Sequence, residues 1–553
     1  MNEIDRYARK VVAGSILAGK YQRLACERHL RDRLREGTKK FPYRFEIARA
    51  ERFFRFAEQL RHYKGEWAGR RIALQPHQRF RLGSMFGWVH VETRLRRFRT
   101  VYSEIPRKNG KSLEAAVVAL YATFFDGEPG AEGFVIATKR AQAKIVFADC
   151  KRLVQSSGLR SRVAVLTTNL NYDRIAAKLE PLGADSDSTD GLNPQIVIID
   201  EAHAMKTRGM IDVMETATGA RRQPLVFWIT TAGSDPMTPC GDQHHYACQI
   251  LDRVIVDETC FAFIAHADED DDPFEERTWK KANPNYGVSV KPDDMRALAR
   301  KAEAMPAAAA AFKQKRLNLW VNAIAPWLSL EGWRRGQSTW TPESLHHEPC
   351  WLGIDLSSKI DLTAVAAVFP PHEARRRWRV LVWCVTPEDT LDDRAHRDRA
   401  PYRTWVERGW LVTNPGNRID QDVVRELVRR AAAQFDVQHV GIDPWNAGNL
   451  VKDLTEDGHR VVEIPQTLPQ MSGPAKEFEA DVLDGLVDGG HNDLLTWAIS
   501  NVRIQTDNKE NIYPTKKRSR GRIDPVIATL MARKLAALDT SAPIAEDPDL
   551  IVA

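Results

Sequence analysis

Cysteine is scarce in this chain: among 553 residues there are seven, an odd number scattered along the sequence. Such a set does not form a disulfide framework and fits a reducing compartment. Long apolar runs are also missing, because no run approaches the roughly 18 residues of a membrane span and charges interrupt the N-terminal segment. The sequence therefore predicts a cytoplasmic protein with no membrane contact and no secretory signal.

Neither sign of charge dominates the composition. Lys and Arg number 80 and Asp and Glu number 74, which gives a formal net charge of +6. This mildly basic balance allows a nucleic-acid partner without proving one. Hydrophobic residues make up 43% of the chain, which excludes a largely disordered protein. The length exceeds the roughly 100–200 residues of one domain, so two or three domains are expected.

Strand-like and helical segments alternate in the first half of the chain. Short β-rich runs lie at 100–105, 134–138, 196–200 and 225–230, and a helical pattern covers 111–125. This alternation predicts an α/β domain whose mostly parallel sheet is covered on both faces.

The second half begins a new β-rich pattern. Strands are predicted at 351–357, 363–369 and 378–385, followed by a helix (420–434), a strand (437–443) and another helix. Three strands, then helix, strand and helix, is the order of the ribonuclease H-like fold. The expected organisation is a basic helical lead-in (1–65), a first α/β domain (66–267), a helical edge and linker (268–348), a second, ribonuclease H-like domain (349–538) and an acidic tail (539–553).

A strand-to-helix turn carries Gly110, Lys111 and Ser112 in PRKNGKS. Amides at a helix N-terminus bind anions, Lys111 can reach the phosphates of a nucleotide, and the Ser112 hydroxyl can ligate Mg²⁺. The full phosphate-loop pattern has glycine where this chain has Ile105, so a solvated basic turn is the alternative. Arg107, in the same loop, could stabilise transition-state charge.

Asp200 and Glu201 follow a buried apolar strand. In a nucleoside triphosphatase Asp200 would hold the Mg²⁺ shell, and Glu201 would orient and deprotonate the attacking water. The alternative is a helix N-cap. Combined with the upstream PRKNGKS turn, the pair predicts ATP hydrolysis.

Two further segments are candidates around the nucleotide. Thr230, Thr231 and Gly233 end an apolar strand and could sense the γ-phosphate, although a plain glycine turn explains them equally well. Gln78 could contact adenine or simply begin a helix.

Three aspartates form a second candidate site. Asp355 and Asp443 fall at strand ends, and Asp524 opens a helix. In a ribonuclease H-like arrangement these positions meet and could hold two Mg²⁺ or Mn²⁺ ions for phosphodiester cleavage, with Asp361 as an auxiliary acid. Each alone is more simply a cap or turn. The basic run 516–522 beside Asp524 suits a DNA backbone, or is a solvated loop.

Cys240, His244 and Cys248 lie four residues apart, so on a helix they share one face. A helix face cannot complete a tetrahedral zinc site alone, and ordinary packing is the preferred interpretation.

In combination and order these motifs resemble the large subunit of a tailed-phage DNA-packaging terminase. The resemblance covers about 70–535 and rests on PRKNGKS, IVIIDEAHAM, WITTAG, WKKANPNYG, RLNLW, GIDLS, GIDPW and RIDPVIATLMA. Phosphate loops of that family commonly lack the first glycine and carry an arginine. The resemblance implies a P-loop ATPase of the ASCE type joined to a ribonuclease H-like nuclease.

The resemblance also implies roles and partners. Lys111 and Ser112 would serve ATP and Mg²⁺, Asp200 and Glu201 would act as the Walker B pair, and Thr230 to Gly233 would couple hydrolysis to motion. Partners would be double-stranded DNA, a portal protein, a terminase small subunit and further large subunits in a ring. The place of action would be the host cytoplasm and, transiently, the procapsid portal, not the mature virion. A helicase or remodelling ATPase, and an integrase-like nuclease with an inactive nucleotide site, are the alternatives.

Overall fold

The structure, a computed structural model, describes residues 1–138, 140–183, 191–320, 327–357, 362–445, 447–507, 511–516, 519 and 521–540. Two compact units, Met1–Ala323 and Ile324–Ala553, make up the chain and are treated separately. Over the described residues, no helix has both the length and the apolar character to cross a membrane.

The first unit is built on an eight-stranded sheet in the order β10-β3-β9-β8-β4-β7-β6-β5. Neighbouring strands from β10 to β7 are parallel, whereas β6 and β5 pair antiparallel at the far edge. The strands are β3 (Thr100–Glu104), β4 (Glu132–Ala137), β5 (Ala164–Val165), β6 (Leu170–Tyr172), β7 (Ala177–Gly183), β8 (Pro194–Asp200), β9 (Leu225–Thr230) and β10 (Cys260–Ile264). The predicted parallel sheet is confirmed, and β10 at its edge was not predicted.

Strand β9 lies between β3 and β8, so the segments leading to Lys111 and Asp200 are separated by one strand. Glu104 is paired with Thr230, and Asp200 with Ile229. All three strands are parallel, so their carboxyl ends meet at one edge of the sheet, where α/β proteins bind ligands.

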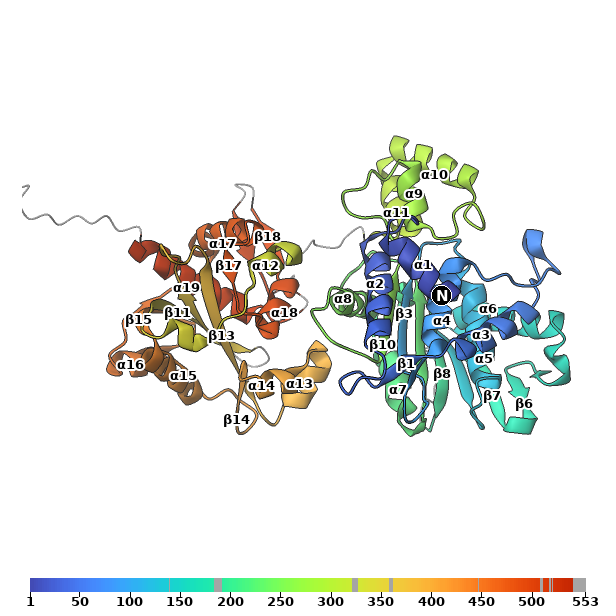
Figure 1. Cartoon of the computed structure of the whole chain (residues 1–553), viewed down its shortest axis with the longest axis horizontal. Coiled ribbons are helices and arrows are strands. Elements are labelled where there is room, and N and C mark those ends of the chain that lie inside the picture. Colours follow the sequence, from blue (N-terminus) through green and yellow to red (C-terminus); the bar gives the residue numbers. More distant parts are fainter. Residues whose placement is uncertain are drawn as a thin grey trace, which may run out of the picture. The chain divides into compact units, whose positions relative to one another are not determined.

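Helices surround this sheet. They are α1 (Glu3–Val12), α2 (Lys20–Leu34), α3 (Ile47–Gln59), α4 (Pro76–Gly87), α5 (Lys111–Phe124), α6 (Arg140–Ser156), α7 (Gly209–Ala217), α8 (Pro239–Leu251), α9 (Glu276–Ala282), α10 (Pro292–Ala304) and α11 (Pro306–Leu317). A small antiparallel pair, β1 (Tyr43–Phe45) with β2 (Trp88–His90), accompanies them. Figure 1 shows α9, α10 and α11 as a separate group at one end of this unit, with a core of their own around Trp279, Met295 and Phe312.

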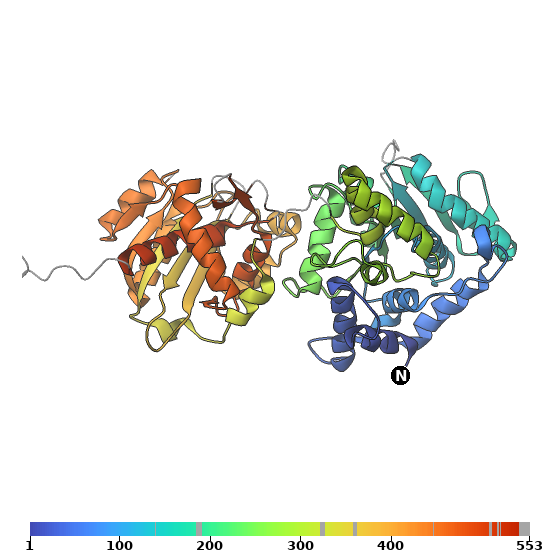
Figure 2. The ribbon, with the colours of Figure 1, turned by 90° about the horizontal axis from the view of Figure 1, so that it is seen from above.

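The N-terminal helices belong to the same core as the sheet. Ile4, Tyr7 and Phe53 are buried in one hydrophobic cluster with strand residues such as Val101 and Ile198. In Figure 2 these helices (blue) lie directly against the rest of the unit. Residues 1–65 therefore contribute apolar packing to the ATPase sheet, because their amphipathic faces bury against it.

The second unit contains a mixed sheet in the order β14-β13-β12-β11-β15-β16, with β17 pairing with β13. Strands β11, β12 and β13 are antiparallel neighbours, and β15 lies parallel to β11. The strands are β11 (Pro349–Asp355), β12 (Thr363–Phe369), β13 (Trp378–Pro387), β14 (Leu411–Asn414), β15 (Asp436–Ile442), β16 (Val461–Glu463) and β17 (Val487–Asp488), with a separate hairpin of β18 (Ile504–Thr506) and β19 (Ile512–Pro514). The prediction that the first strand of this domain, β11, lies beside the strand that ends near Asp443, β15, is confirmed.

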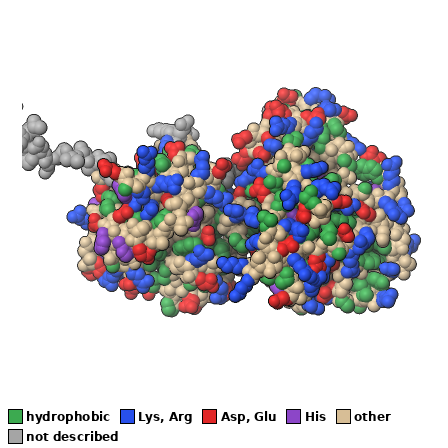
Figure 3. Space-filling view, in the orientation of Figure 1, with side chains coloured by type: hydrophobic (Ala, Val, Ile, Leu, Met, Phe, Trp, Pro, Cys, Tyr) green, Lys and Arg blue, Asp and Glu red, His purple; other side chains and the backbone are tan. Residues whose placement is uncertain are grey.

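Helices cover both faces of the second sheet. They are α12 (Leu330–Gly336), α13 (Leu391–Asp398), α14 (Tyr402–Glu407), α15 (Gln421–Gln434), α16 (Gly448–Glu456), α17 (Leu468–Leu483), α18 (Asp493–Asn501) and α19 (Asp524–Thr540). Figure 1 shows α19 on one side of the sheet and α15 and α16 on the other. Figure 3 shows basic and acidic side chains interspersed over the visible face of each unit, as the near balance of charge leads one to expect.

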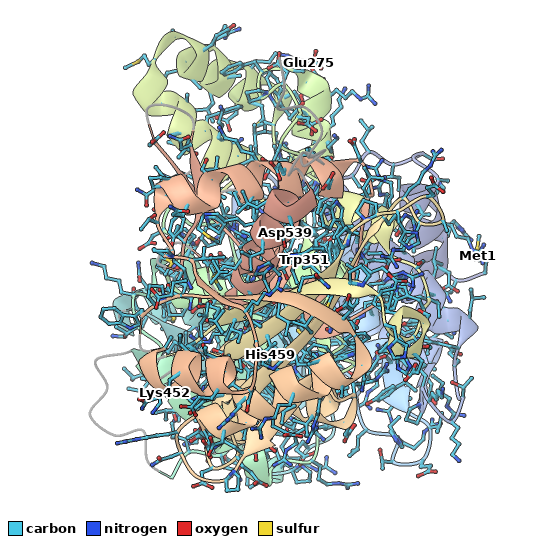
Figure 4. The ribbon with its side chains drawn as sticks, turned by 90° about the vertical axis from the view of Figure 1, so that its left-hand side faces the viewer. Met1, Glu275, Trp351, Lys452, His459 and Asp539 are labelled. Atoms are coloured by element: carbon cyan, nitrogen blue, oxygen red, sulfur yellow. The ribbon has the colours of Figure 1, made fainter. Side chains whose placement is uncertain are left out.

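Alternation along β11 explains how α19 comes so close to the sheet. Leu352 and Ile354 point into the core shared with α15 and α16. Gly353 faces α19, where a Cβ atom would lie 2.0 Å from the carbonyl oxygen of Ala528. At the other end of α19, the Trp351 indole donates to Asp539 at 2.6 Å, and Figure 4 shows these two residues beside each other.

Candidate active sites

The loop after β3 has the backbone shape of a phosphate cradle. Gly110 precedes the first residue of α5 with φ 85°, in the left-handed region that glycine adopts without strain. Ile105, which stands where the usual pattern has glycine, is fully buried and its amide donates to Thr230. The side chain at this position extends the core of the sheet, so the turn forms without the first glycine.

Lys111 is buried at the base of this loop. Its ammonium donates to the carbonyl oxygens of Ile105 at 2.8 Å and Pro106 at 3.2 Å. Burial lowers the pKa of Lys111 to about 8, although the negative charges of Glu201 and Asp200 act to raise it. Lys111 thus lies within electrostatic reach of the acidic pair while it bonds to neutral carbonyls.

The acidic pair occupies the end of β8. Asp200 is 8% exposed, and its Oδ1 has no hydrogen-bond partner among the described residues. Burial, together with the neighbouring charge of Glu201, raises the pKa of Asp200 to about 7. A buried carboxylate oxygen without a donor fits a cation ligand, which is what the expected Mg²⁺ requires.

Glu201 adopts φ 48°, in the left-handed region, directly after the last residue of β8. Burial alone would raise the pKa of Glu201, but the His203 hydrogen bond and the charges of Lys111 and His203 lower it to about 2. The Thr231 hydroxyl donates to Glu201 Oε2 at 3.4 Å. Glu201 is consequently ionised at physiological pH and oriented from two sides.

The other candidates lie around the same loop. Ser112 is half-buried and Arg107 is exposed. The Gln78 side chain lies near Gly110, where it caps α4 by accepting from the Gln75 amide at 2.9 Å and donates to Glu114 at 3.4 Å. Thr230 binds the His203 ring at 3.2 Å. The structure therefore places Arg107, Gly110, Lys111 and Ser112 on one loop and helix start, with Gln78 of α4 beside Gly110. The adjoining strand ends carry Asp200, Glu201, Thr230 and Thr231.

Sequence reasoning missed the residues that hold this loop in place. Asn109 is fully buried and donates to Asn283 at 2.9 Å, while the Asn285 amide donates to Asn109 at 3.0 Å. Ser289 donates to the Lys108 carbonyl at 2.6 Å. Asn283 and Asn285 belong to the WKKANPNYG stretch and Ser289 follows it by two residues, and nothing local in the sequence signals a contact across so long a separation.

Glu104 was also missed. It is fully buried at the end of β3, where it accepts from His244 Nδ1 at 2.8 Å and from the Tyr102 hydroxyl at 2.5 Å. Cys248 lies 3.5 Å from the other ring nitrogen of His244. The residues 240, 244 and 248 thus share a helix face as predicted, and His244 pairs with a carboxylate of the sheet.

The second unit brings Asp355, Asp443 and Asp524 together from β11, the end of β15 and the start of α19. A cavity of about 460 Å³ is lined by Asp355, Asp443, Gln466, Tyr513 and Lys516, among others. Asp355 and Asp524 are 2% and 0% exposed. Burial raises the pKa of Asp355, and the charge of Asp443 acts in the same direction.

A lysine and an amide contact these acids. Lys516 Nζ lies 2.5 Å from Asp524 Oδ1 and 3.3 Å from Asp355 Oδ2, and Gln466 donates to Asp355 Oδ1 at 2.7 Å. Across the described part of the chain, no three Asp, Glu, His or Cys side chains are close enough to hold a metal ion as they stand. The chemistry of three convergent carboxylates, two of them buried, nevertheless fits divalent cations.

Parts of the predicted site lie outside the described residues: Asp361, and positions 517, 518 and 520 of the basic run. Two cations of that run that are described point inward. Lys516 pairs with the acids, and Arg522 pairs with Asp398 at 3.0 Å. At these two described positions the basic residues form ion pairs and are not simply solvated.

Comparison with known proteins finds two family models. One, described as terminase large subunit, ATPase domain, matches residues 76–249, and the other, terminase large subunit, endonuclease domain, matches residues 254–539. The second match includes α9, α10 and α11, which the structure places in the first unit.

Individual proteins and a solved structure are also similar to this chain. Protein YmfN of Escherichia coli (strain K12) is 31% identical over 62% of this chain and 77% of its own length. The terminase large subunit of Enterobacteria phage HK97 is 28% identical over 77% of this chain and 84% of its own. The crystal structure of the HK97 bacteriophage large terminase superposes with a TM-score of 0.52 at 25% identity, covering 88% of this chain and 99% of that one.

Proposed function

Given that the chain belongs to the terminase large subunit family, we propose that its first unit hydrolyses ATP to move double-stranded DNA into a procapsid and its second unit cuts that DNA. ATPase and endonuclease activity, a role in DNA packaging, and the use of a nucleotide and a divalent metal come with the family. The helicase and integrase-like alternatives each leave one of the two matched domains without a role. Which residues act, and on which ions, is the substance of the proposal.

The observation that most supports the ATPase assignment is that Lys111 lies close enough to Asp200 and Glu201 to feel their charges. Lys111 and the amides at Gly110 would bind the β- and γ-phosphates, and Ser112 and Asp200 would hold a Mg²⁺ ion, which would supply charge neutralisation. Glu201, ionised and held by His203 and Thr231, orients the attacking water and accepts its proton.

Further loop and strand residues support this reaction. Arg107 is exposed in the loop and supplies positive charge to the transition state, and Gln78 lies at the start of α4, where adenine would approach. Thr230, through His203, links the β9 end to Glu201. Such a link would transmit loss of the γ-phosphate to the adjoining strand.

Asp355, Asp443 and Asp524 would hold two Mg²⁺, or Mn²⁺, in the nuclease. Such ions would supply water activation and stabilisation of the leaving oxygen of the phosphodiester. Asp355 and Asp524 would contribute buried carboxylates, and Asp443, which is half-buried and lines the cavity, would contribute the third.

The remaining partners follow from the family rather than from contacts in this chain. They are a portal protein, a terminase small subunit and further copies of the large subunit in a ring. The protein would act in the host cytoplasm and at the procapsid portal.

Two substitutions assayed for both activities test this proposal. Lys111→Ala should abolish ATP turnover and leave metal-dependent DNA cutting, whereas Asp355→Asn should do the reverse. Matched controls are Lys108→Asn, which removes an exposed cation of the same loop at a left-handed position, and Asp436→Asn at the opposite end of β15. Loss of both activities from either change in folded protein, or no loss from either, would contradict the two-site assignment.

A further inference from the structure

Lys516 contacts two of the proposed nuclease acids, and no catalytic role assigned above uses it. It follows β19 in the turn that leads towards α19. Its ammonium bridges two different carboxylates, at 2.5 Å from Asp524 Oδ1 and 3.3 Å from Asp355 Oδ2. The same nitrogen therefore contacts residues from β11 and α19.

Two buried carboxylates so close to one cation need that cation. Asp355 and Asp524 are almost fully buried, and ionised carboxylates cannot lie together in a low-dielectric interior without a counter-charge. Hydrogen bonds between ionised partners are about twice as strong as neutral ones. Lys516 supplies one positive charge where the proposed reaction needs divalent ions.

The ammonium and a metal ion would use the same oxygen atoms. A Mg²⁺ or Mn²⁺ ligand oxygen lies about 2.0–2.2 Å from its ion, so an ion bound to Asp355 and Asp524 together excludes the Lys516 nitrogen from its present position. Gln466 holds the remaining oxygen of Asp355 at 2.7 Å.

The Lys516 side chain has space to move into. Its side chain is 39% exposed although its nitrogen contacts two buried acids, and it lines the cavity shared with Asp355, Asp443 and Tyr513. Rotation of its flexible stem would move the charge into that cavity without unfolding the turn.

We propose that Lys516 is a built-in counter-cation that holds the metal-free nuclease centre together and is displaced when divalent metal binds. This inference rests on the proposed metal role of Asp355 and Asp524. Metal affinity at the nuclease centre is then set by competition, since each binding event must break the Lys516 ion pairs.

Chemical footprinting of the full-length wild-type chain tests displacement directly. Acetylation of lysines, read by mass spectrometry, should modify Lys516 slowly in EDTA and at least about threefold faster with saturating Mn²⁺, because a side chain released from an ion pair is accessible. Lys452, whose side chain is 75% exposed on α16, should react equally in both conditions. Equal reactivity of Lys516 with and without Mn²⁺ would overturn the proposal.

Calorimetric titration of nucleotide-free protein with Mn²⁺ provides the second test. Lys516→Met, which keeps length and removes charge, should bind about tenfold more tightly than wild type, since the competing ion pair is gone. It should also unfold at lower temperature in EDTA and recover more on adding Mn²⁺. Lys452→Met is the control. Unchanged or weaker binding by a folded Lys516→Met or Lys516→Gln protein contradicts the proposal.

Asp355→Asn distinguishes a failure of the Lys516 displacement from a failure of the proposed metal site. It should remove both the Mn²⁺ heat of the nuclease centre and the metal effect on Lys516 labelling. If Asp355→Asn binds Mn²⁺ as wild type does, the metal assignment itself is wrong. If Asp355→Asn abolishes binding while Lys516 labelling never depends on metal in the wild type, only the displacement is wrong.

Discussion

Asp200→Asn should stabilise the nucleotide-free first unit while abolishing ATP hydrolysis. The reason is the pKa of Asp200, which burial and the charge of Glu201 raise from 3.8 to about 7. In the folded state the proton is held more tightly than in the unfolded state. Stability therefore falls as pH rises from about 3.8 to 7, and above pH 7 the full cost of the buried charge is present.

The size of the effect follows from the shift. One pKa unit corresponds to about 1.4 kcal/mol, so ionised Asp200 destabilises the unit by about 4 kcal/mol above pH 7. At about pH 5.5 the same linkage gives about 2 kcal/mol, and below about pH 3.8 it vanishes. Asparagine has no such charge, so its advantage over aspartate should grow with pH across this window.

Urea unfolding of the metal-free protein, followed through the transition of the first unit, measures this advantage at about pH 5.5 and about pH 8.5. Asp293→Asn is the matched control, because that side chain is 96% exposed at the start of α10. A stability difference between Asp200→Asn and wild type that is negative, or that stays constant with pH, would refute the electrostatic reasoning.

Two further substitutions probe the packing behind each site. Glu114→Gln should cost about 3–5 kcal/mol of first-unit stability in urea, because Arg81 and Glu114 pair through two bonds at 2.7 Å with side chains 2% and 1% exposed. Asp392→Asn, which breaks an exposed pair, is its control, and a loss below about 1 kcal/mol would contradict the expectation. Gly353→Ala should lower the stability of the second unit by more than about 3 kcal/mol, since its Cβ would meet Ala528 O at 2.0 Å. Gly448→Ala, with open space around it, should leave the melting temperature unchanged or higher, and equal melting of the two variants would show that α19 can shift.

Local patterns predicted the elements and the positions of the acids well. The apolar runs before Asp200 and Asp355 gave β8 and β11, because buried strands need continuous apolar side chains. The order of elements placed β15 beside β11, which brings Asp443 to the same edge as Asp355. Edge strands such as β10 were harder, since CFAFI is as compatible with a buried helix turn as with a strand.

Long-range polar contacts could not be predicted. The bonds from Asn109 to Asn283 and Asn285 join positions more than 170 residues apart, and asparagine carries no periodic signal that reveals such a partner. The basic run at 516–522 shows the same limit. Sequence gives the sign of the charge at Lys516, but only the approach of α19 to β11 decides that the charge faces two acids and not solvent.

Both units place a lysine at their acids, and the partners of each lysine set how readily it can be moved. Lys111 donates to neutral carbonyls of its own loop, so a phosphate oxygen can replace them at small cost and with a gain in charge pairing. Lys516 contacts two buried carboxylates, and once they are ionised its removal would leave uncompensated charge until another cation binds. On the proposal made above, phosphate can bind at Lys111 directly, whereas a divalent ion has to displace Lys516 before it can bind Asp355 and Asp524.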